Sequence, residues 1–586
     1  MSSAMCSPLA RARRPVPRGR IARRRITKLS AFASSASSID TCVLSVDVGT
    51  TALKAMLLAP DGTAIASTER AYATGTASGE SGLSGAIEQQ PGEWLDAFIE
   101  ASHDLLDPLG TDASPAGIAL SGQMQNVCPV SDGRSLRSCL LYSDVRAMRE
   151  ADDITEKLAM DGSSAEAKLA NFKGAAACLC KWLWLARNDG ETLRKSTRLL
   201  LGAHSYVAYA LCGGDDEACA CDPTTASTTG LLTPPRLSRD GTVPEPTWAV
   251  ESIGAFDGVD PSLLPRLVTG STPAPIGEVS RWTADALNLP ASLVGVPVFH
   301  GVGDLASTTV GAVGIGASSG ASYMYLGTSG WIARCVPWTD ILSIDGTEDR
   351  YVGDGVFRLL HPDPSLAIVA ASMVTAGGNV EFARKTLLPK GSNSAKDLDA
   401  RASDAKAGSD GVLYLPHLNG ERSPFTDPTA RGALVNLSPA TTTGTMCRAV
   451  LEGVAYNYRT LSNALGMDTT GAIDEPLPMV GGGARSKLWT STIADVLRRP
   501  IAPKSDAASV AARGCAAGAF QYLRLWEGAD GDLPPDGYFP GTSQVGSVDG
   551  VVTPNDANAS VHDGNYAVWS KLHEALKSAG AGELVR

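Results

Sequence analysis

The chain has 586 residues, a formal net charge of −12 and 44% hydrophobic residues. A chain of this length and apolar content can bury more than one core, so we expect two domains. The acidic balance argues against a nucleic-acid-binding surface, which needs clustered Lys and Arg, and favours a small molecule as partner. Composition leaves two oligomeric states open, a monomer and a homodimer.

The first 39 residues differ in composition from the rest. They carry nine positive charges, eight of them Arg, among Ser and Ala, and the first acidic residue is Asp40. This composition is typical of a transit peptide, so we leave residues 1–39 out of the fold. We expect a plastid location, with a mitochondrion as the alternative. Without those nine charges the formal net charge is −21.

Neither a membrane span nor a disulfide framework is predicted. The uncharged stretch 305–333 is long enough to cross a bilayer, but it is rich in Gly, Ser and Thr and ends in a strand-like alternation. Twelve cysteines in so long a chain do not form a disulfide scaffold. The pairs Cys178/Cys180 and Cys219/Cys221 are spaced C-x-C, unlike a zinc knuckle, so we interpret them as buried or redox-sensitive thiols, with zinc as the alternative.

The segment VLSVDVGTTALKAMLL, residues 43–58, predicts a β-hairpin. A β-branched apolar run leads to a glycine that permits a tight turn, and a second strand returns. The tip would place backbone N–H groups and the hydroxyls of Thr50 and Thr51 beside the carboxylate of Asp47. Such a turn can hold a phosphate and its metal ion; an ordinary glycine turn is the alternative.

A second segment repeats this pattern. YMYLGTSGWIARC, residues 323–335, again runs from an apolar strand through Gly-Thr-Ser into another strand. Repeated units usually indicate repeated architecture, so the two turns would face each other across a cleft and hold one polyphosphate. Coincidence between two short glycine turns is the alternative. Between the repeats we expect a third strand over 64–72, a helix after Pro91 and a buried strand over 116–124.

Three familiar motifs were tested against this interpretation. The chain has no G-x-x-x-x-G-K-[ST], which excludes a P-loop. GVGDLA, residues 301–306, matches a dinucleotide fingerprint but lacks the acidic residue expected about 20 residues later. GASSG has the form of a nucleophile elbow around Ser318, but it leads into a strand-like segment and not into a helix. A serine hydrolase is therefore the cross-class alternative.

Two further glycine-rich turns follow apolar strands. Asp304 lies in the first, without a nearby Lys or Arg, where a carboxylate can take a proton from a substrate hydroxyl. A helix N-cap is the alternative for Asp304. In MVGGGARSKLW, residues 479–489, bare backbone at three glycines would let a base or ribose lie close to a helix N-terminus. A helix of small residues, 511–520, would pack beneath.

Taken in order, these segments resemble the FGGY family of carbohydrate kinases, and within it the xylulose kinases. The likeness runs from Cys42 to about Lys577, through VDVGTTALKAML, EQQPGEWL, SGQM, GVGDLASTTVGAVGIG, YLGTSG, YLPHLNGERSPFTDPTARGALVNLS with RAVLEGVAYNYR, and GGGARSKLW. It implies an α/β protein with a duplicated actin-like ATPase (ribonuclease H-like) fold, two lobes around a catalytic cleft. Residues 40–315 would form the N-terminal sugar-binding lobe and residues 316–586 the C-terminal nucleotide-binding lobe.

The resemblance also implies a role for each motif. ATP with Mg²⁺ would be the phosphoryl donor, and Asp304 would deprotonate the terminal hydroxyl of a ketose. Asp47 would hold Mg²⁺ through water. The implied sugar contacts are Met124, Gln125, Asp304 and Leu305, and the implied ATP contacts are Gly49, Thr50, Thr51, Gly327, Thr328, Gly482 and Gly483.

Departures from the family pattern bear on the substrate. Xylulose kinases usually read Gly-Gln-Met-His-Gly in the sugar loop, whereas this chain has Gln125 and Asn126 after Met124, and Leu305 stands where Asn is usual. An alkyl chain in place of an amide leaves a sugar hydroxyl unpaired. We expect D-xylulose, converted to D-xylulose 5-phosphate, with D-ribulose or another ketose or polyol as alternatives. A non-catalytic actin-like scaffold is the other class of function.

Overall fold

The computed structural model gives the fold of most of the chain. The expected transit peptide and Ser318 lie outside the described residues. These are residues 39–73, 85–110, 113–239, 243–269, 274–314, 319–342, 355–467, 475–504, 507–525 and 550–581.

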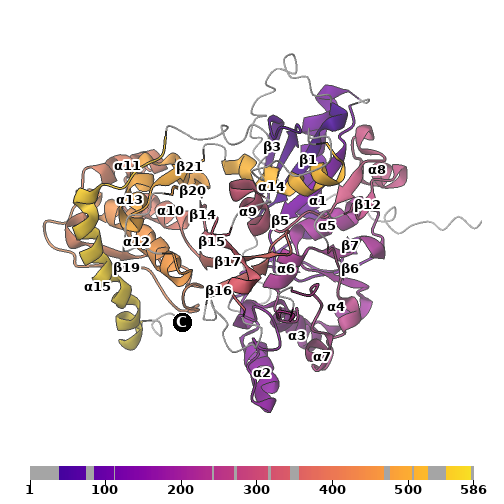
Figure 1. The fold of residues 1–586 in the computed structure, drawn as a ribbon, viewed down its shortest axis with the longest axis horizontal. Coiled ribbons are helices and arrows are strands. Elements are labelled where there is room, and N and C mark those ends of the chain that lie inside the picture. Colours follow the sequence, from indigo (N-terminus) through magenta and orange to yellow (C-terminus); the bar gives the residue numbers. More distant parts are fainter. Residues whose placement is uncertain are drawn as a thin grey trace, which may run out of the picture.

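The first lobe is built on a six-stranded sheet in the order β12-β13-β5-β1-β2-β3 (Figure 1). The central strand β1 pairs antiparallel with β2 and parallel with β5, which confirms the predicted hairpin. The helix expected after Pro91 is α1. The bounds are β1 Val43–Val48, β2 Ala52–Leu58, β3 Ala64–Ala71, β5 Gly117–Gly122, β12 Gly277–Glu278, β13 Pro297–Phe299, α1 Pro91–Leu106 and α5 Ala203–Leu211.

The second lobe repeats this topology in the order β16-β17-β15-β14-β20-β21. Here β14 pairs antiparallel with β15 and parallel with β20, as β1 does with β2 and β5. The shared pattern confirms the duplicated fold. The bounds are β14 Ser322–Leu326, β15 Gly330–Pro337, β16 Val356–Leu360, β17 Leu366–Met373, β20 Leu477–Val480, β21 Ile501–Pro503, α10 Gly377–Thr386, α11 Ala395–Ser403, α12 Thr443–Ala464, α13 Lys487–Leu497 and α15 Ala559–Ser578.

Two helices cross between the lobes. α9 (Asp304–Val313) follows the first sheet, but its Ala306 and Ala312 pack with Tyr323 and Ala333 of the second. α14 (Ala507–Tyr522) follows the second sheet but packs on β1 and β5, where the Ser45 hydroxyl donates to its backbone at 2.8 Å. Figure 1 shows the orange α14 among the indigo and purple elements of the first lobe. The lobe boundary at residues 315/316 stays a prediction.

Shorter elements complete the two lobes; β18 and β19 belong to the second lobe and the others to the first. They are β4 Glu88–Gln89, β6 Cys128–Ser131, β7 Arg134–Ser135, β8 Cys139–Leu140, β9 Arg198–Leu200, β10 Ala220–Cys221, β11 Arg266–Leu267, β18 Leu413–Leu415, β19 Ala433–Val435, α2 Met148–Leu158, α3 Cys178–Asn188, α4 Gly190–Lys195, α6 Pro223–Thr228, α7 Val250–Gly254 and α8 Arg281–Leu287.

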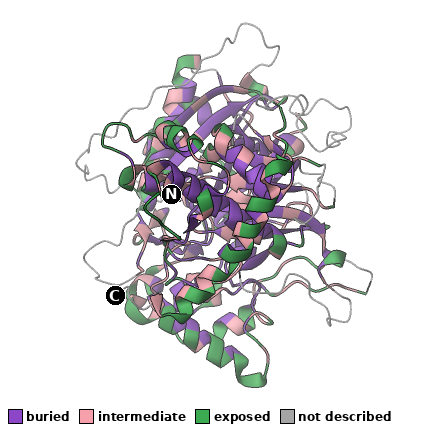
Figure 2. Cartoon of the chain, turned by 90° about the vertical axis from the view of Figure 1, so that its left-hand side faces the viewer, coloured by how far each residue is buried: buried purple, intermediate pink, exposed green. Residues whose placement is uncertain are grey.

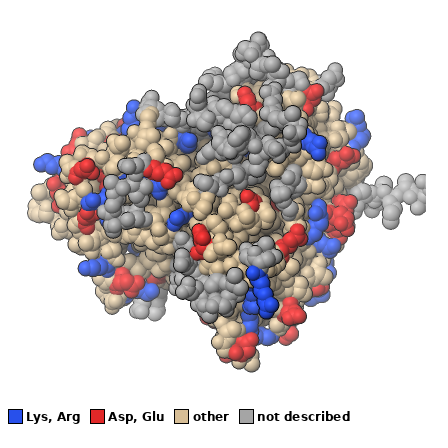
Figure 3. Space-filling model, in the orientation of Figure 1, with Lys and Arg blue, Asp and Glu red and all other residues tan. Residues whose placement is uncertain are grey.

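Burial follows the layers of the two lobes. The central strands are apolar on both faces because helices cover each sheet, and Figure 2 shows them buried inside a shell of exposed helices. On the face in Figure 3, acidic and basic side chains are intermingled. Among the described helices, none has both the length and the apolar character needed to cross a bilayer. Both C-x-C pairs are buried free thiols.

Candidate active site

Asp47 lies near the end of β1, opposite Lys54 on β2 and Ser121 on β5. Burial raises the pKa of the Asp47 carboxyl, and its electrostatic interactions with Lys54 and then His204 act against that shift. Its Oδ1 is buried and has no hydrogen-bond partner among the described residues. An unpartnered carboxylate oxygen is the kind of ligand that Mg²⁺ prefers, so the residue fits the predicted metal role.

The first turn, Gly49–Thr51, is braced by side chains from two other motifs. Gln89 Nε2 donates to the Thr50 carbonyl at 2.6 Å. Gln89 Oε1 in turn accepts from Trp94 Nε1 at 3.2 Å and from Gln123 Nε2 at 2.8 Å. The EQQPGEWL and SGQM segments therefore hold the turn in place. Sequence reasoning did not assign this role to the three side chains, because their partners are distant along the chain.

Asp304 is the first residue of α9, and Gly303 occupies the N-cap position. Burial first, and then the charge of Asp47, raise the pKa of Asp304 to about 7; the Leu305 N–H and Arg422 act in the opposite direction. The two carboxylates therefore lie close enough to interact, as predicted. A carboxyl group with this pKa can accept a proton at neutral pH.

The sugar loop lies against the start of α9. A Cβ added at Gly303 would lie 2.0 Å from Met124 Sδ, so only glycine allows this approach. Gln125 is buried in a left-handed conformation (φ +61°), and its carbonyl accepts from Lys181 Nζ at 2.7 Å. Asn126 is fully buried, and its Oδ1 accepts the Tyr142 N–H at 3.1 Å. Asn126, which departs from the family pattern, therefore helps to hold the backbone of the loop in place.

Leu305, predicted as a sugar contact, packs against the second lobe. Its side chain packs against the apolar cluster that contains Tyr323. The Leu305 carbonyl accepts the Tyr323 hydroxyl at 3.1 Å. These contacts anchor the start of α9 on the second sheet, and a contact between Leu305 and a sugar stays a prediction.

The second turn follows β14 and is tied to the N-terminus of α10. The N–H of Gly377 donates to the Gly327 carbonyl at 2.8 Å, and that of Gly378 to the Thr328 carbonyl at 3.0 Å. Tyr325, just before the turn, has a pKa raised by burial and by the charges of Asp47 and Asp304. Tyr325, and with it the second turn, therefore lies near Asp47 of the first lobe and near Asp304 at the start of α9. The Gly-Gly pair of α10 was not singled out from sequence, although two glycines after an apolar strand are a signal for such a turn.

The predicted nucleoside motif lies beside the second turn. Gly481 has φ +101°, and an added Cβ there would lie 2.4 Å from the Leu326 carbonyl oxygen. A Cβ at Gly483 would lie 2.3 Å from the Leu326 side chain, whereas one at Gly482 would meet no atom within 4 Å. Gly482 therefore presents bare backbone to open space, and its neighbours allow close packing on β14. The predicted helix begins at Lys487, with Ser486 as its N-cap.

A buried polar cluster that the sequence did not reveal supports the turn before Asp304. Asp222 Oδ1 accepts the Gly303 N–H at 3.3 Å, and its Oδ2 lies 3.2 Å from His204 Nε2. His300 Nε2 lies 2.9 Å from the Ser205 hydroxyl. Burial alone would raise the pKa of Asp222, but His204 and then His300 hold it at about 2. Asp222 therefore carries a fixed negative charge beneath the site.

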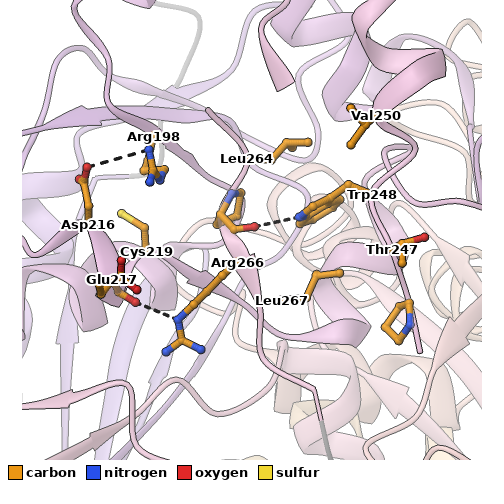
Figure 4. A pocket seen from close by; sticks show the side chains of 12 residues that line it. Arg198, Asp216, Glu217, Cys219, Thr247, Trp248, Val250, Leu264, Arg266 and Leu267 are labelled. Atoms are coloured by element: carbon orange, nitrogen blue, oxygen red, sulfur yellow. Dashed lines mark hydrogen bonds and ion pairs between the residues drawn. The ribbon is translucent and has the colours of Figure 1, made fainter. Parts of the chain in front are cut away.

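The first lobe also contains an open cavity of about 520 Å³ (Figure 4). Its polar groups are paired with each other: Arg198 with Asp216 at 3.9 Å, and Arg266 Nε with the Glu217 carbonyl at 2.9 Å. No predicted site residue lines it. The predicted site around Asp304 and this cavity are therefore separate.

Duplicated sheets, each with a Gly-Thr turn after its central strand, define a two-lobed protein with the actin-like ATPase fold, and the raised pKa of Asp304 suits a phosphotransferase. The family model described as "FGGY family of carbohydrate kinases, N-terminal domain" matches residues 42–311, and that for the C-terminal domain matches residues 338–520. The chain belongs to the FGGY family of carbohydrate kinases.

Named relatives refine this placement. The xylulose kinase of Staphylococcus xylosus is 26% identical over 486 residues, covering 80% of this chain and 90% of that protein. That of Streptomyces rubiginosus is 28% identical over 507 residues, covering 84% and 92%. The crystal structure of xylulose kinase from Rhodospirillum rubrum is similar with a TM-score of 0.71 at 25% identity, covering 92% and 99%. The chain is therefore an enzyme, a xylulokinase-like sugar kinase, and not a hydrolase or a scaffold.

Proposed function

We propose that the enzyme transfers the γ-phosphoryl group of ATP to the terminal hydroxyl of D-xylulose, giving D-xylulose 5-phosphate. The observation that carries the proposal is Asp304, whose pKa is about 7 and is raised in part by the charge of Asp47. Asp304 follows Gly303, where the chain packs against Met124 of the sugar loop. The relatives named xylulose kinases support this choice of sugar. D-ribulose, or another ketose or polyol, is the alternative acceptor.

The proposed mechanism assigns one step to each part of the cleft. The Asp304 carboxylate takes the hydroxyl proton as the sugar oxygen bonds to the γ-phosphorus, and the bond from that phosphorus to the β–γ bridging oxygen breaks to release ADP. Gly49, Thr50 and Thr51 would bind the phosphates from one lobe, with Gly327 and Thr328 opposite and Gly482 and Gly483 under the nucleoside. Mg²⁺, held through water by Asp47, would neutralise phosphate charge. Lobe closure would exclude competing water.

A panel of ketoses, aldoses and polyols with ATP and Mg²⁺ tests the substrate, with ADP release and phosphorylated product as readouts. We expect D-xylulose to give the highest kcat/KM. A higher value for D-ribulose or a polyol would replace the proposed acceptor. If no sugar stimulates ADP release, the proposed function is wrong.

Asp304→Asn tests the proposed base. The amide keeps the shape of the side chain but cannot take the proton, so we expect kcat with the best sugar to fall by about 10² to 10⁴ while ATP binding stays within about twofold. ATP binding is measured by calorimetry. Unchanged turnover would contradict the role of Asp304.

We also propose that residues 1–39 direct the protein to a plastid. A fusion of these residues to a fluorescent reporter tests this in a plastid-containing cell. Accumulation of the reporter in mitochondria would support the alternative location.

A further inference from the structure

Arg422 is a cation of the second lobe that reaches a side chain of the first. It lies in the loop 416–432 between β18 and β19, and its guanidinium carbon is 5.7 Å from the centre of the Tyr142 ring. In the described part of the chain its guanidinium has neither an ion pair nor a hydrogen-bond acceptor. Both side chains are half-buried. The contact therefore joins the two lobes, and the same charge also acts on Asp304.

The neighbouring acid does not neutralise this charge. Glu421 is buried, and its Oε1 accepts the N–H groups of Val374 at 3.1 Å and Arg422 at 2.9 Å. Its Oε2 lies 2.9 Å from His417 Nδ1 and accepts from Asn457 Nδ2 at 2.9 Å. The carboxylate is fully occupied by groups that fix the loop. Glu421 therefore positions the backbone of Arg422 and leaves its guanidinium free.

Tyr142, on the other side of the contact, is connected to the sugar loop. Its N–H donates to Asn126 Oδ1 at 3.1 Å. The buried Lys181 Nζ donates to the carbonyls of Leu141 at 2.9 Å and Gln125 at 2.7 Å. A displacement of the Tyr142 ring would therefore disturb the backbone that presents Met124 and Gln125.

Arg422 and Tyr142 each interact electrostatically with a residue of the predicted site or next to it. The charge of Arg422 lowers the pKa of Asp304, against the larger effect of burial. Tyr325, which precedes the second turn, interacts electrostatically with Tyr142. A guanidinium over an aromatic ring contributes about 0.5–2 kcal/mol, more when water is excluded.

We propose that Arg422 is a positioning residue that couples closure of the lobes to the sugar loop through its contact with the Tyr142 ring. The proposal rests on the proposed function, because it concerns the sugar-binding side of the same cleft. The contact is present in this arrangement of the lobes, where it links the sugar loop to the second lobe, and it would be lost if the lobes separated.

A double-mutant cycle between Arg422 and Tyr142 tests the coupling, with whichever acceptor the sugar panel identifies. For Arg422→Gln and Tyr142→Leu we expect the KM for the sugar to rise about tenfold each and the KM for ATP to stay within about twofold. The double variant should be no worse than either single variant, because both remove one interaction. Tyr142→Phe, which keeps the aromatic face, should stay close to wild type.

Arg431→Gln is the matched control, because Arg431 lies in the same loop and, among the described residues, its guanidinium donates to carbonyls of its own loop, those of Pro428 and Ala430. It should leave both KM values unchanged. Additive losses in the double variant, or an equal rise in both KM values, would overturn the proposal.

A readout without a sugar separates this proposal from the proposed function. Small-angle X-ray scattering of the ATP-bound protein should give a larger radius of gyration for Arg422→Gln than for wild type and Arg431→Gln. If no sugar is phosphorylated, this difference is still expected. An unchanged radius of gyration would overturn the coupling whatever the acceptor is.

Discussion

The carboxyl group of Asp304 lies where burial and the charge of Asp47 both oppose its ionisation. The same surroundings make it a suitable base, because its pKa of about 7 matches the operating pH of a cell. Asp222 lies beneath it and stays ionised, since His204 and His300 compensate its burial. Carboxylates in one site thus differ in protonation because their neighbours differ.

This difference predicts the pH dependence of the enzyme. The base must be deprotonated, so kcat/KM for the sugar should be flat above pH 7 and fall about tenfold per pH unit below it. The measurement is a pH profile from 5 to 9 at saturating ATP and Mg²⁺. A profile that stays flat down to pH 5, as expected for a carboxyl group of ordinary pKa, would show that the ATP-bound enzyme does not hold Asp304 as described.

The crossing of α9 and α14 links the two sheets at the level of elements. A Cβ added at Gly514 would lie 1.8 Å from the Ser307 carbonyl oxygen, and one at Gly311 1.8 Å from the Val510 carbonyl oxygen. The helices therefore touch backbone to backbone. Because Asp304 begins α9, this contact also fixes the position of the predicted base relative to the first sheet.

Gly514→Ala should force the two helices apart. We expect a loss of about 1–3 kcal/mol in unfolding free energy, as for other overpacked interiors, together with a fall in kcat. Urea denaturation and steady-state kinetics measure the two effects. Gly564→Ala in α15 is the control, because its added Cβ meets no atom within 4 Å and should be neutral or stabilise by up to about 1 kcal/mol. Equal behaviour of the two variants would contradict the close crossing.

The elements differ in how far the sequence could predict them. The strands around each Gly-Thr turn were predictable, because β-branched runs ending at a glycine are local signals, and both hairpins are confirmed. The small-residue sequence of α14 predicted close packing, but the partner expected from the sequence, the glycine-rich nucleoside turn, was wrong, since a helix face does not specify which sheet it covers. The helix packs on α9, β1 and β5. The bracing of the first turn by Gln89 and Gln123 was equally hidden, because it depends on contacts between distant segments.

At the scale of the whole molecule, the lobes are also joined along the edge of the second sheet. The edge strand β16 is bonded by first-lobe side chains along its free side. Asn171 Nδ2 donates to the Arg358 carbonyl at 2.8 Å, and Thr224 Oγ1 to the Leu360 carbonyl at 2.6 Å. The Leu360 N–H donates to Ser227 Oγ at 3.2 Å. Thr224 and Ser227 lie on α6, whose N-cap is Asp222. Because Asp222 also accepts the Gly303 N–H, α6 connects the edge of β16 to the turn before Asp304.

These bonds should limit how far the lobes separate. The double variant Thr224→Val with Ser227→Ala removes both contacts to Leu360, at about 1 kcal/mol each. We expect a larger radius of gyration for the free protein in solution scattering. The KM values for sugar and ATP should rise together, because less of the protein occupies the closed state that binds both. For Arg422→Gln the KM for the sugar should rise much more than that for ATP, because the sugar loop also loses its contact with the second lobe.

Thr228→Val is the matched control for this variant. Thr228 lies on the same helix and is buried, but in the part of the chain that the structure describes its hydroxyl donates to the Thr225 carbonyl within α6, at 2.7 Å. It should therefore lose a comparable hydrogen bond without changing the radius of gyration or either KM. If the double variant lowers Tm but leaves the radius of gyration and both KM values at wild-type levels, the edge of β16 contributes to stability alone. The position of the lobes would then be set by the crossing of α9 and α14.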